Sequence, residues 1–240
     1  MSERQTLFDG RLVCRQHENG YRFSIDAVLI AHFVQHRANE RLLDLGCGCG
    51  VIGLILCYRH PVLKVTGVEL QPALVRLAIG NAEENGYENR LTIQQGDLRR
   101  IGEVVQPESF DGVITNPPYR CPGRGRINTR DESAIARHEL TADMDTVLAA
   151  ASFAVKNRGK VACIYPADRL ATLIATMERH RLTAKRLQAV YSYPADDHAR
   201  LVMVEAVKNG GEGLRILSPL FIYTHPCGPY SPQVRAFYKP

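Results

Sequence analysis

The sequence lacks long apolar runs and lacks the cysteine and histidine spacings of metal sites. No run approaches the roughly 20 apolar residues that a membrane-spanning helix needs. Seven cysteines occur without a CxxC motif, and we interpret the close pair Cys47 and Cys49 as small residues in a tight loop. The start, Met1–Gln5, does not resemble a secretory signal. These absences predict a cytoplasmic protein with reduced cysteines, bound to neither a membrane nor a metal.

The composition is that of an ordinary globular protein. The chain has 240 residues, 45% of them hydrophobic and 23% charged, with no internal repeat. This length predicts one domain of about 200 residues with appendages. We place the domain at 41–217, an N-terminal lid or substrate segment at 1–40, and a C-terminal tail at 218–240. The net charge of +5 says little by itself, and the sequence leaves the oligomeric state open.

Strand-like and helix-like patterns alternate from residue 41 to residue 208, which predicts a parallel α/β sheet. The expected strands are 41–45, 64–69, 91–95, 110–115 and 160–165, followed by a closing antiparallel pair at 186–193 and 200–208. The expected helices are 51–58, 72–85, 141–156 and 167–180. Outside the domain, Ser24 is the expected cap of an apolar helix through Val34, and Ser231 that of a short helix beginning at Pro232.

A glycine-rich loop, Asp44-Leu-Gly-Cys-Gly-Cys-Gly50, lies where the first strand meets its helix. Alternating glycines let the backbone turn sharply and approach a ligand closely, where a Cβ would clash. Their spacing alone does not identify the ligand, because Gly48-x-Gly50-x-x-Gly53 also satisfies the dinucleotide fingerprint. An NAD-type cofactor is therefore one interpretation of this loop.

Acidic residues follow three successive strands, and they favour a different cofactor. Asp44 is placed to reach a cationic amino group, Glu69 to bind ribose hydroxyls, and Asp97 to accept from an adenine amine. Each acid alone could be a solvated loop residue. Together, at the carboxyl ends of adjacent strands, they fit a cationic, phosphate-free nucleoside better than a dinucleotide. The sequence thus predicts S-adenosylmethionine as cofactor.

Asn116-Pro117-Pro118-Tyr119 follows the fourth strand and predicts the chemistry. The Asn116 side chain offers a carbonyl that accepts a hydrogen bond from a substrate N–H. The prolines fix the turn and have no amide hydrogen, so its carbonyls stay available as acceptors. Tyr119 offers a face on which a base can stack. The alternative is a proline-rich turn with a surface tyrosine. We favour a site that positions a planar amine or amide for attack on a methyl donor.

DLGCGCG, VEL, GDL and NPPY occur here in the order of class I S-adenosylmethionine-dependent amino-methyltransferases, and the chain resembles this family. It is similar in particular to the bacterial tRNA-1(Val) N6-adenine methyltransferases, through GYRFSIDAVLIA (20–31), NPPY with a basic loop, IARHEL (135–140) and the tail. The resemblance implies a Rossmann-like, seven-stranded, mostly parallel sheet with helices on both faces and an antiparallel last strand. It implies cofactor contacts from Asp44, Gly46, Gly48, Glu69, Leu70, Asp97, Leu98 and Asn116. Asn116, Pro117 and Tyr119 would carry the substrate amine. CGCG departs from the usual T/S-G-S-G, which removes hydroxyl groups from the cofactor loop.

Two further segments are candidates for substrate contact. The loop after Tyr119 is rich in basic residues, and we expect it to bind RNA phosphates through Arg120, Arg124, Arg126, Arg130, Arg137 and His138. The segment before the first strand could form a lid over the cofactor through Tyr21, Arg22, Phe23 and Asp26, or could simply lead into the following helix.

The expected activity is methyl transfer to the N6 amine of an adenine in tRNA beside the anticodon. A protein-glutamine methyltransferase acting on release factors remains an alternative, because a glutamine amide poses the same chemical problem. The basic loop and the mere forty residues before the first strand favour RNA. Ribosomal RNA or DNA as acceptor, and a non-catalytic RNA-binding protein, also remain open.

Overall fold

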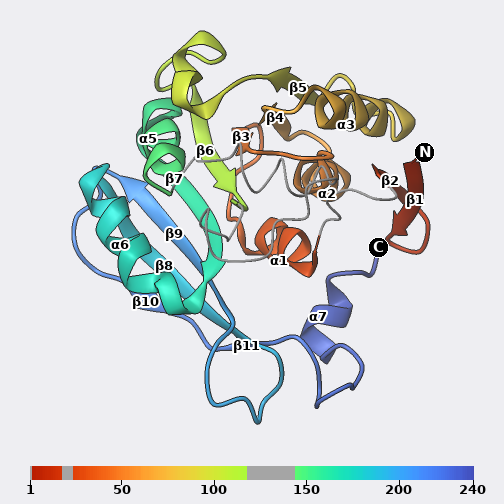
Figure 1. Cartoon of the computed structure of the whole chain (residues 1–240), viewed down its shortest axis with the longest axis vertical. Coiled ribbons are helices and arrows are strands. Elements are labelled where there is room, and N and C mark those ends of the chain that lie inside the picture. Colours follow the sequence, from red (N-terminus) through yellow and green to blue (C-terminus); the bar gives the residue numbers. More distant parts are fainter. Residues whose placement is uncertain (1, 18–23, 118–143) are drawn as a thin grey trace, which may run out of the picture.

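The computed structural model describes residues 2–17, 24–117 and 144–240. In this part of the chain, nine strands form one sheet in the order β10-β8-β9-β7-β6-β3-β4-β5, with β11 also paired to β8 (Figure 1). Its strands are β3 (Arg41–Leu45), β4 (Lys64–Glu69), β5 (Leu91–Gln95), β6 (Phe110–Thr115), β7 (Val155–Pro166), β8 (Leu182–Tyr191), β9 (Leu201–Lys208), β10 (Arg215–Ile216) and β11 (Leu220–Phe221).

The seven longer strands confirm the predicted sheet. Strands β3 to β7 pair in parallel, and β9 runs antiparallel to both of its neighbours, β7 and β8. Strands β10 and β11, which the sequence did not predict, add two residues each in parallel to β8.

Helices cover both faces of this sheet (Figure 1). They are α1 (Ile25–Phe33), α2 (Val51–Arg59), α3 (Pro72–Glu84), α5 (Met144–Ala154), α6 (Leu170–Arg179) and α7 (Pro232–Ala236), with short 3-10 turns η1 (Leu98–Glu103) and η2 (Ala167–Arg169). Successive residues of β3 alternate between two cores: Leu42 packs with α1 and α2, and Leu43 with α5. Burial on both faces explains the apolar runs of the central strands β3 and β6. No helix of the described part is long and apolar enough to cross a membrane.

Local sequence signals set several helix ends. Pro72 begins α3, and Gly86 follows that helix with φ +68°, a left-handed conformation that glycine adopts without strain. The Ser231 hydroxyl caps α7 by accepting a hydrogen bond from the Val234 N–H at 3.2 Å. Ser24 does precede α1, but its side chain makes no capping hydrogen bond, so the predicted position is right and the predicted interaction is wrong.

The N-terminal segment begins with a hairpin that the sequence analysis did not predict. Strands β1 (Ser2–Leu7) and β2 (Leu12–His17) pair antiparallel beside α3. Two asparagines, Asn81 of α3 and Asn85 that caps the end of this helix, form hydrogen bonds with the backbone of β2. Asn85 exchanges two hydrogen bonds with the Val13 backbone, at 2.9 and 2.7 Å, and Asn81 exchanges two with the Arg15 backbone, at 2.8 and 3.0 Å. A carboxamide presents the same donor and acceptor as a peptide, so the pair replaces a missing strand.

Candidate active site

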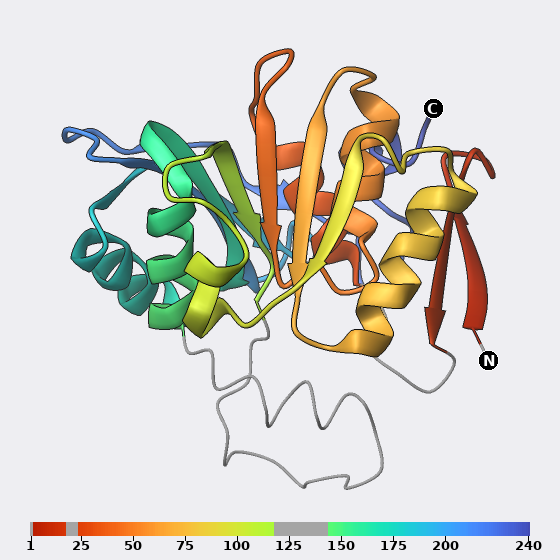
Figure 2. The same cartoon turned by 90° about the horizontal axis from the view of Figure 1, so that it is seen from above.

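The carboxyl ends of β3, β4 and β6 bring the predicted site residues to one edge of the sheet. Figure 2 shows these strands ending on the lower side of the view, where α3 also begins. In register, Leu45 pairs with Val68 of β4 on one side and with Thr115 of β6 on the other. Asp44, Glu69 and Asn116 therefore lie at the ends of three adjacent strands, as the sequence predicted.

Backbone hydrogen bonds fold the glycine loop against the end of β4. The N–H groups of Gly46 and Cys47 both donate to the Val68 carbonyl, at 2.8 and 3.1 Å, and the Gly48 N–H donates to the Glu69 carboxylate at 2.9 Å. Gly48 has φ +57°, which a side chain rarely tolerates, and no atom of the described residues lies within 4 Å of the place where its Cβ would stand. The loop thus leaves room for a ligand at its surface.

Asp44 is the most unusual charged group of the site. Its side chain is 1% exposed, and among the described residues neither carboxylate oxygen has a hydrogen-bond partner. Burial, and secondarily the negative charge of Glu69, raises the pKa of Asp44 to about 7. A buried carboxylate without a partner is costly, so the geometry fits a cationic or hydrogen-bond-donating group of a ligand.

Glu69 lies beside Asp44 and is held in a fixed orientation. It is 6% exposed, and its two oxygens accept from the N–H groups of Gly48 and Gln71, each at 2.9 Å. Burial raises the pKa of Glu69, although these backbone N–H groups oppose the shift. Each oxygen retains a lone pair, so the carboxylate can accept two further hydrogen bonds from adjacent hydroxyls.

The end of β6 places the predicted amine-binding residues next to the glycine loop. Asn116 is partly exposed, whereas Pro117 is buried. The Thr115 hydroxyl donates to the Leu45 carbonyl at 3.1 Å and so ties the ends of β6 and β3 together. This connection fixes the position from which Asn116 extends.

Comparison with known proteins assigns the family. Residues 24–143 match the family described as the methyltransferase small domain. A tRNA1(Val) (adenine(37)-N6)-methyltransferase of Porphyromonas gingivalis is 30% identical over 75% of this chain and 72% of its own length. The chain belongs to the methyltransferase small domain family.

Two further similarities agree with this family. A tRNA1(Val) (adenine(37)-N6)-methyltransferase of Yersinia pseudotuberculosis is 34% identical to this chain. The matched region covers 59% of this chain and 55% of the relative's length. Among solved structures, a predicted O-methyltransferase of Agrobacterium tumefaciens superimposes with a TM-score of 0.73 at 22% identity, over 89% of this chain and 95% of the other. A geranyl diphosphate C-methyltransferase of Streptomyces coelicolor superimposes with a TM-score of 0.55 at 12% identity, over 76% of this chain and 78% of the other. The chain therefore has the class I methyltransferase fold.

Asp97 occupies the expected place in this methyltransferase fold, but it already has a partner. Its carboxylate accepts from the Arg99 N–H at 2.9 Å and forms an ion pair with the Arg99 guanidinium, which lowers the pKa of Asp97. An adenine amine would have to share this carboxylate with Arg99. Leu98 and Leu70, the other predicted contacts at these strand ends, are partly buried.

Several predicted residues lie outside the described part of the chain. They are Tyr119, the basic residues Arg120, Arg124, Arg126, Arg130, Arg137 and His138, and the lid residues Tyr21, Arg22 and Phe23. The fourth lid residue, Asp26, is described: it lies in the first turn of α1 and is 8% exposed.

Two side chains that the sequence analysis did not identify, Asn81 and Cys14, contact the glycine loop at Cys49. Asn81 is fully buried, and besides binding β2 it donates to the Cys49 carbonyl at 2.9 Å. The thiols of Cys49 and Cys14 lie 3.7 Å apart, so Cys49 has a spatial neighbour that sequence spacing did not reveal. An asparagine inside an apolar helix pattern was the available signal for this contact.

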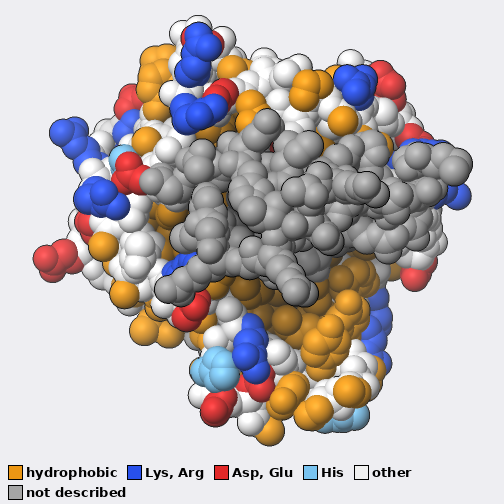
Figure 3. All heavy atoms as spheres, in the orientation of Figure 1, with side chains coloured by type: hydrophobic (Ala, Val, Ile, Leu, Met, Phe, Trp, Pro, Cys, Tyr) orange, Lys and Arg blue, Asp and Glu red, His pale blue; other side chains and the backbone are white. Residues whose placement is uncertain are grey.

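Figure 3 views the molecule onto the carboxyl edge of the sheet. In the part of this face that is coloured, Lys and Arg side chains are scattered, and hydrophobic side chains gather towards α7. Among residues 2–17, 24–117 and 144–240, no group of three or more His, Cys, Asp or Glu side chains is arranged to hold a metal ion.

Proposed function

We propose that this protein transfers the methyl group of S-adenosylmethionine to the N6 amine of an adenine in tRNA, beside the anticodon. The observation that carries the proposal is Asp44, a buried carboxylate without a described partner, at the end of the strand between those of Glu69 and Asn116. The fold and family are those of methyltransferases, and the relatives' names supply the acceptor.

The residues present fit the cofactor. Asp44 would accept from its cationic amino group, which compensates the cost of the buried charge. Glu69 would accept hydrogen bonds from both ribose hydroxyls, through the carboxylate lone pairs that are not used by the N–H groups of Gly48 and Gln71. The open surface at Gly48 would receive the methionine portion. Gly46, Leu70, Asp97 and Leu98 would complete the pocket around the nucleoside. When bound, S-adenosylmethionine supplies a methyl carbon attached to a sulfonium.

Asn116 and Pro117 would prepare the amine for its attack. An exocyclic amine is a weak nucleophile because its lone pair is delocalised into the ring. The Asn116 side-chain carbonyl and the Pro117 main-chain carbonyl would each accept a hydrogen bond from one N–H of the amine. These two hydrogen bonds would favour a pyramidal nitrogen. These hydrogen bonds strengthen as positive charge develops on nitrogen, so they stabilise the transition state more than the bound substrate. Tyr119 would hold the unpaired base by stacking.

The remaining predicted residues would contact the rest of the substrate. Arg120, Arg124, Arg126, Arg130, Arg137 and His138 would bind RNA phosphates, because an arginine-rich segment directly after Tyr119 adjoins the reacting base in sequence. Tyr21, Arg22, Phe23 and Asp26 would lie over the cofactor.

The test separates the possible acceptors. The protein is incubated with S-adenosylmethionine labelled in the methyl group and, in parallel samples, with total tRNA, with tRNA from which tRNA-1(Val) has been removed, with ribosomal RNA, with DNA and with a release factor. We expect label as N6-methyladenosine in total tRNA and its loss in the depleted sample. Label in the release factor instead would assign the protein-glutamine activity, and absence of label in every acceptor would leave a non-catalytic RNA-binding protein.

A further inference from the structure

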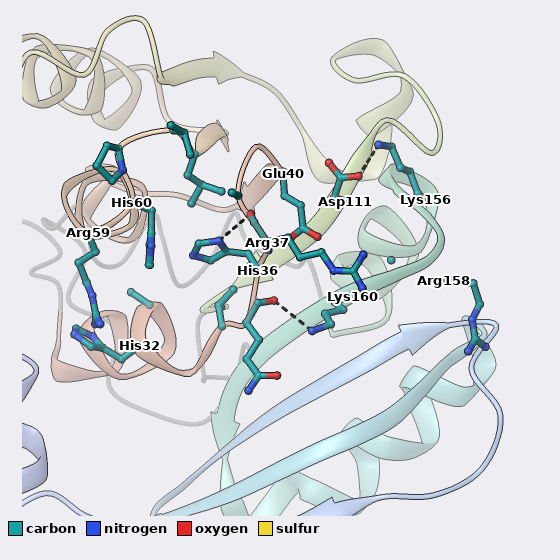
Figure 4. A pocket seen from close by; sticks show the side chains of 18 of the residues that line it. His32, His36, Arg37, Glu40, Arg59, His60, Asp111, Lys156, Arg158 and Lys160 are labelled. Carbon is teal, nitrogen blue, oxygen red and sulfur yellow. Dashed lines mark hydrogen bonds and ion pairs between the residues drawn. The ribbon is translucent and has the colours of Figure 1, made fainter.

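A groove opens at the amino edge of the sheet, opposite the candidate active site. It encloses about 940 Å³ between the segment after α1, the end of α2 and the start of β7. We call it the amino-edge groove; its charged lining residues are Arg37, Glu40, Arg59, Asp111, Lys156, Arg158 and Lys160, with His32, His36 and His60 (Figure 4). Strand β3 separates the two sites, and its five residues span about 15 Å.

Positive charge dominates the amino-edge groove. Five Lys and Arg side chains line it against two carboxylates. Both carboxylates already have donors within the protein. Asp111 accepts from the Arg41 N–H at 2.8 Å and from the Lys156 ammonium at 2.5 Å. Glu40 accepts from the Arg37 N–H at 2.9 Å. Lys160 forms an ion pair with the buried Glu205 at 3.7 Å. The other three cations of the groove form no ion pair among the described residues.

Three guanidinium groups of the groove have no acidic partner among the described residues: those of Arg37, Arg59 and Arg158. Arg158 donates to the Asn209 carbonyl at 2.9 Å. The ring of His36 meets that of His60 edge-on, with centroids 4.0 Å apart, and burial, His36 and Arg59 together lower the pKa of His60 to about 4. Partial burial lowers the pKa of Arg59 as well. His60 is therefore neutral near pH 7, and the positive charge of the groove comes from its Lys and Arg side chains.

The cations are arranged along the groove rather than around a point. In Figure 4, Arg59 lies beside His32 at one end and Arg158 at the other, with Arg37 and Lys160 between them. A single phosphate needs converging donors, whereas a chain of phosphates needs cations in a row. The row suits a polyanionic backbone.

We propose that the amino-edge groove binds the phosphate backbone of the RNA substrate at a distance from the target adenine. The inference rests on the proposed function, because that function supplies a polyanion long enough to contact both edges of the sheet. The phosphates in the groove then belong to a part of the RNA remote from the reacting base. Their contribution is to affinity and not to the chemical step.

The experiment measures RNA affinity and methyl transfer with two RNAs: full-length tRNA and a short stem–loop that carries the target adenine. The variant R37E/R59E is compared with wild type. We expect its Kd for full-length tRNA to rise about tenfold at moderate salt, and the slope of log K against log salt to fall by about two. Affinity for the stem–loop, transfer to the stem–loop and affinity for S-adenosylmethionine should stay unchanged. R37K/R59K, which keeps the charge, should bind tRNA like wild type.

Arg11 provides the matched control, since it is an exposed arginine in the turn of the N-terminal hairpin, without a side-chain partner among the described residues. R11E should leave tRNA affinity unchanged. Equal weakening by R11E, equal loss with the stem–loop, or wild-type affinity in R37E/R59E would each overturn the inference. If the wild type transfers methyl groups and R37E/R59E binds tRNA with wild-type affinity, only the proposed role of the groove is refuted. Weakened tRNA binding without methyl transfer by the wild type would refute the proposed activity alone.

Discussion

At the carboxyl ends of β3 and β4 the charged side chains are buried acids, whereas at the amino edge of the sheet they are mostly exposed bases. The contrast occurs within single strands: β3 begins at exposed Arg41 and reaches buried Asp44, and β4 runs from exposed Lys64 to buried Glu69. Burying a charged group costs a large desolvation free energy, whereas an exposed charged group keeps its hydration and costs almost none. Single substitutions at the carboxyl edge should therefore have large effects on cofactor and chemistry, and substitutions at the amino edge small, additive ones.

The largest effect is expected from Asn116→Ala. Removing an acceptor that acts mainly in the transition state should lower kcat for methyl transfer by about 10²–10³-fold. Cofactor affinity should remain close to normal, because the Asp44 and Glu69 contacts are untouched. Asn116→Asp is the matched control: it keeps an acceptor oxygen at the same place and should retain most of the transfer. Single-turnover rates and calorimetric cofactor binding measure both quantities. Unimpaired transfer by Asn116→Ala would reject the assigned role.

Asp44→Asn should weaken cofactor binding about 100-fold, since it removes the charge that faces the cationic amino group. The pH dependence supplies a second readout. With its pKa raised to about 7, Asp44 binds more protons in the folded than in the unfolded protein between about pH 4 and 7. It therefore favours folding at low pH, and the ligand-free protein should lose a few kcal/mol of stability as the pH rises through this window.

In Asp44→Asn that loss should largely disappear, leaving only the smaller contribution of Glu69, whose pKa is raised in the same direction. Cofactor affinity of the wild type should rise from pH 5 to 7 as Asp44 ionises, and that of the variant should stay flat. Denaturant unfolding with and without cofactor measures both trends. Identical pH profiles for the two proteins would show that Asp44 is not the titrating group.

Asn81→Ala tests how the carboxyl edge is supported. The substitution leaves the Arg15 backbone and the Cys49 carbonyl without their partner, and it should lower the free energy of unfolding by about 2 kcal/mol. Asn85→Ala is the control, since it removes hydrogen bonds to Val13 and the Asn81 carbonyl without contacting the glycine loop. Both variants should be destabilised, but the KM for cofactor should rise only in Asn81→Ala. An equal KM in the two variants would make Asn81 purely structural.

The sequence was most informative where a signal is local. The bounds 41–45, 64–69, 91–95 and 110–115 match four strands. Three of them are short runs with buried apolar residues between glycine and polar loops, and 91–95 is a more exposed strand at the end of the sheet. The end of α3 and the cap of α7 were likewise predictable, from Gly86 and Ser231. Placement of the site followed, since the carboxyl ends of adjacent parallel strands meet at one edge.

Contacts between distant residues were not predictable in the same way. Two such contacts depend on how the N-terminal hairpin packs on α3. Cys14 lies against Cys49, and Asn81 forms hydrogen bonds with both β2 and the glycine loop. The hairpin itself had a signal in the turn dipeptide Asp9-Gly10, which the sequence analysis did not use. The pairing of Asp97 with Arg99 is local, but it becomes decisive only once the 3-10 turn η1 brings the two side chains together.

The smallest effect is expected at the amino edge, from Lys156→Met. Lys156 is exposed and pairs with Asp111, which keeps a second donor in the Arg41 N–H. Losing a surface ion pair of this kind should cost less than about 1 kcal/mol at neutral pH. Partial burial of Asp111 opposes ionisation, but the Arg41 N–H and Lys156 outweigh it and lower its pKa. The stability that Lys156 contributes should therefore be present above about pH 4 and fade as the pH falls through the lowered pKa. Urea unfolding of both proteins at pH 7 and at pH 3 measures the difference. A cost at pH 7 as large as that of Asn81→Ala would mean that this ion pair behaves as a buried one, and the contrast between the two edges would not hold.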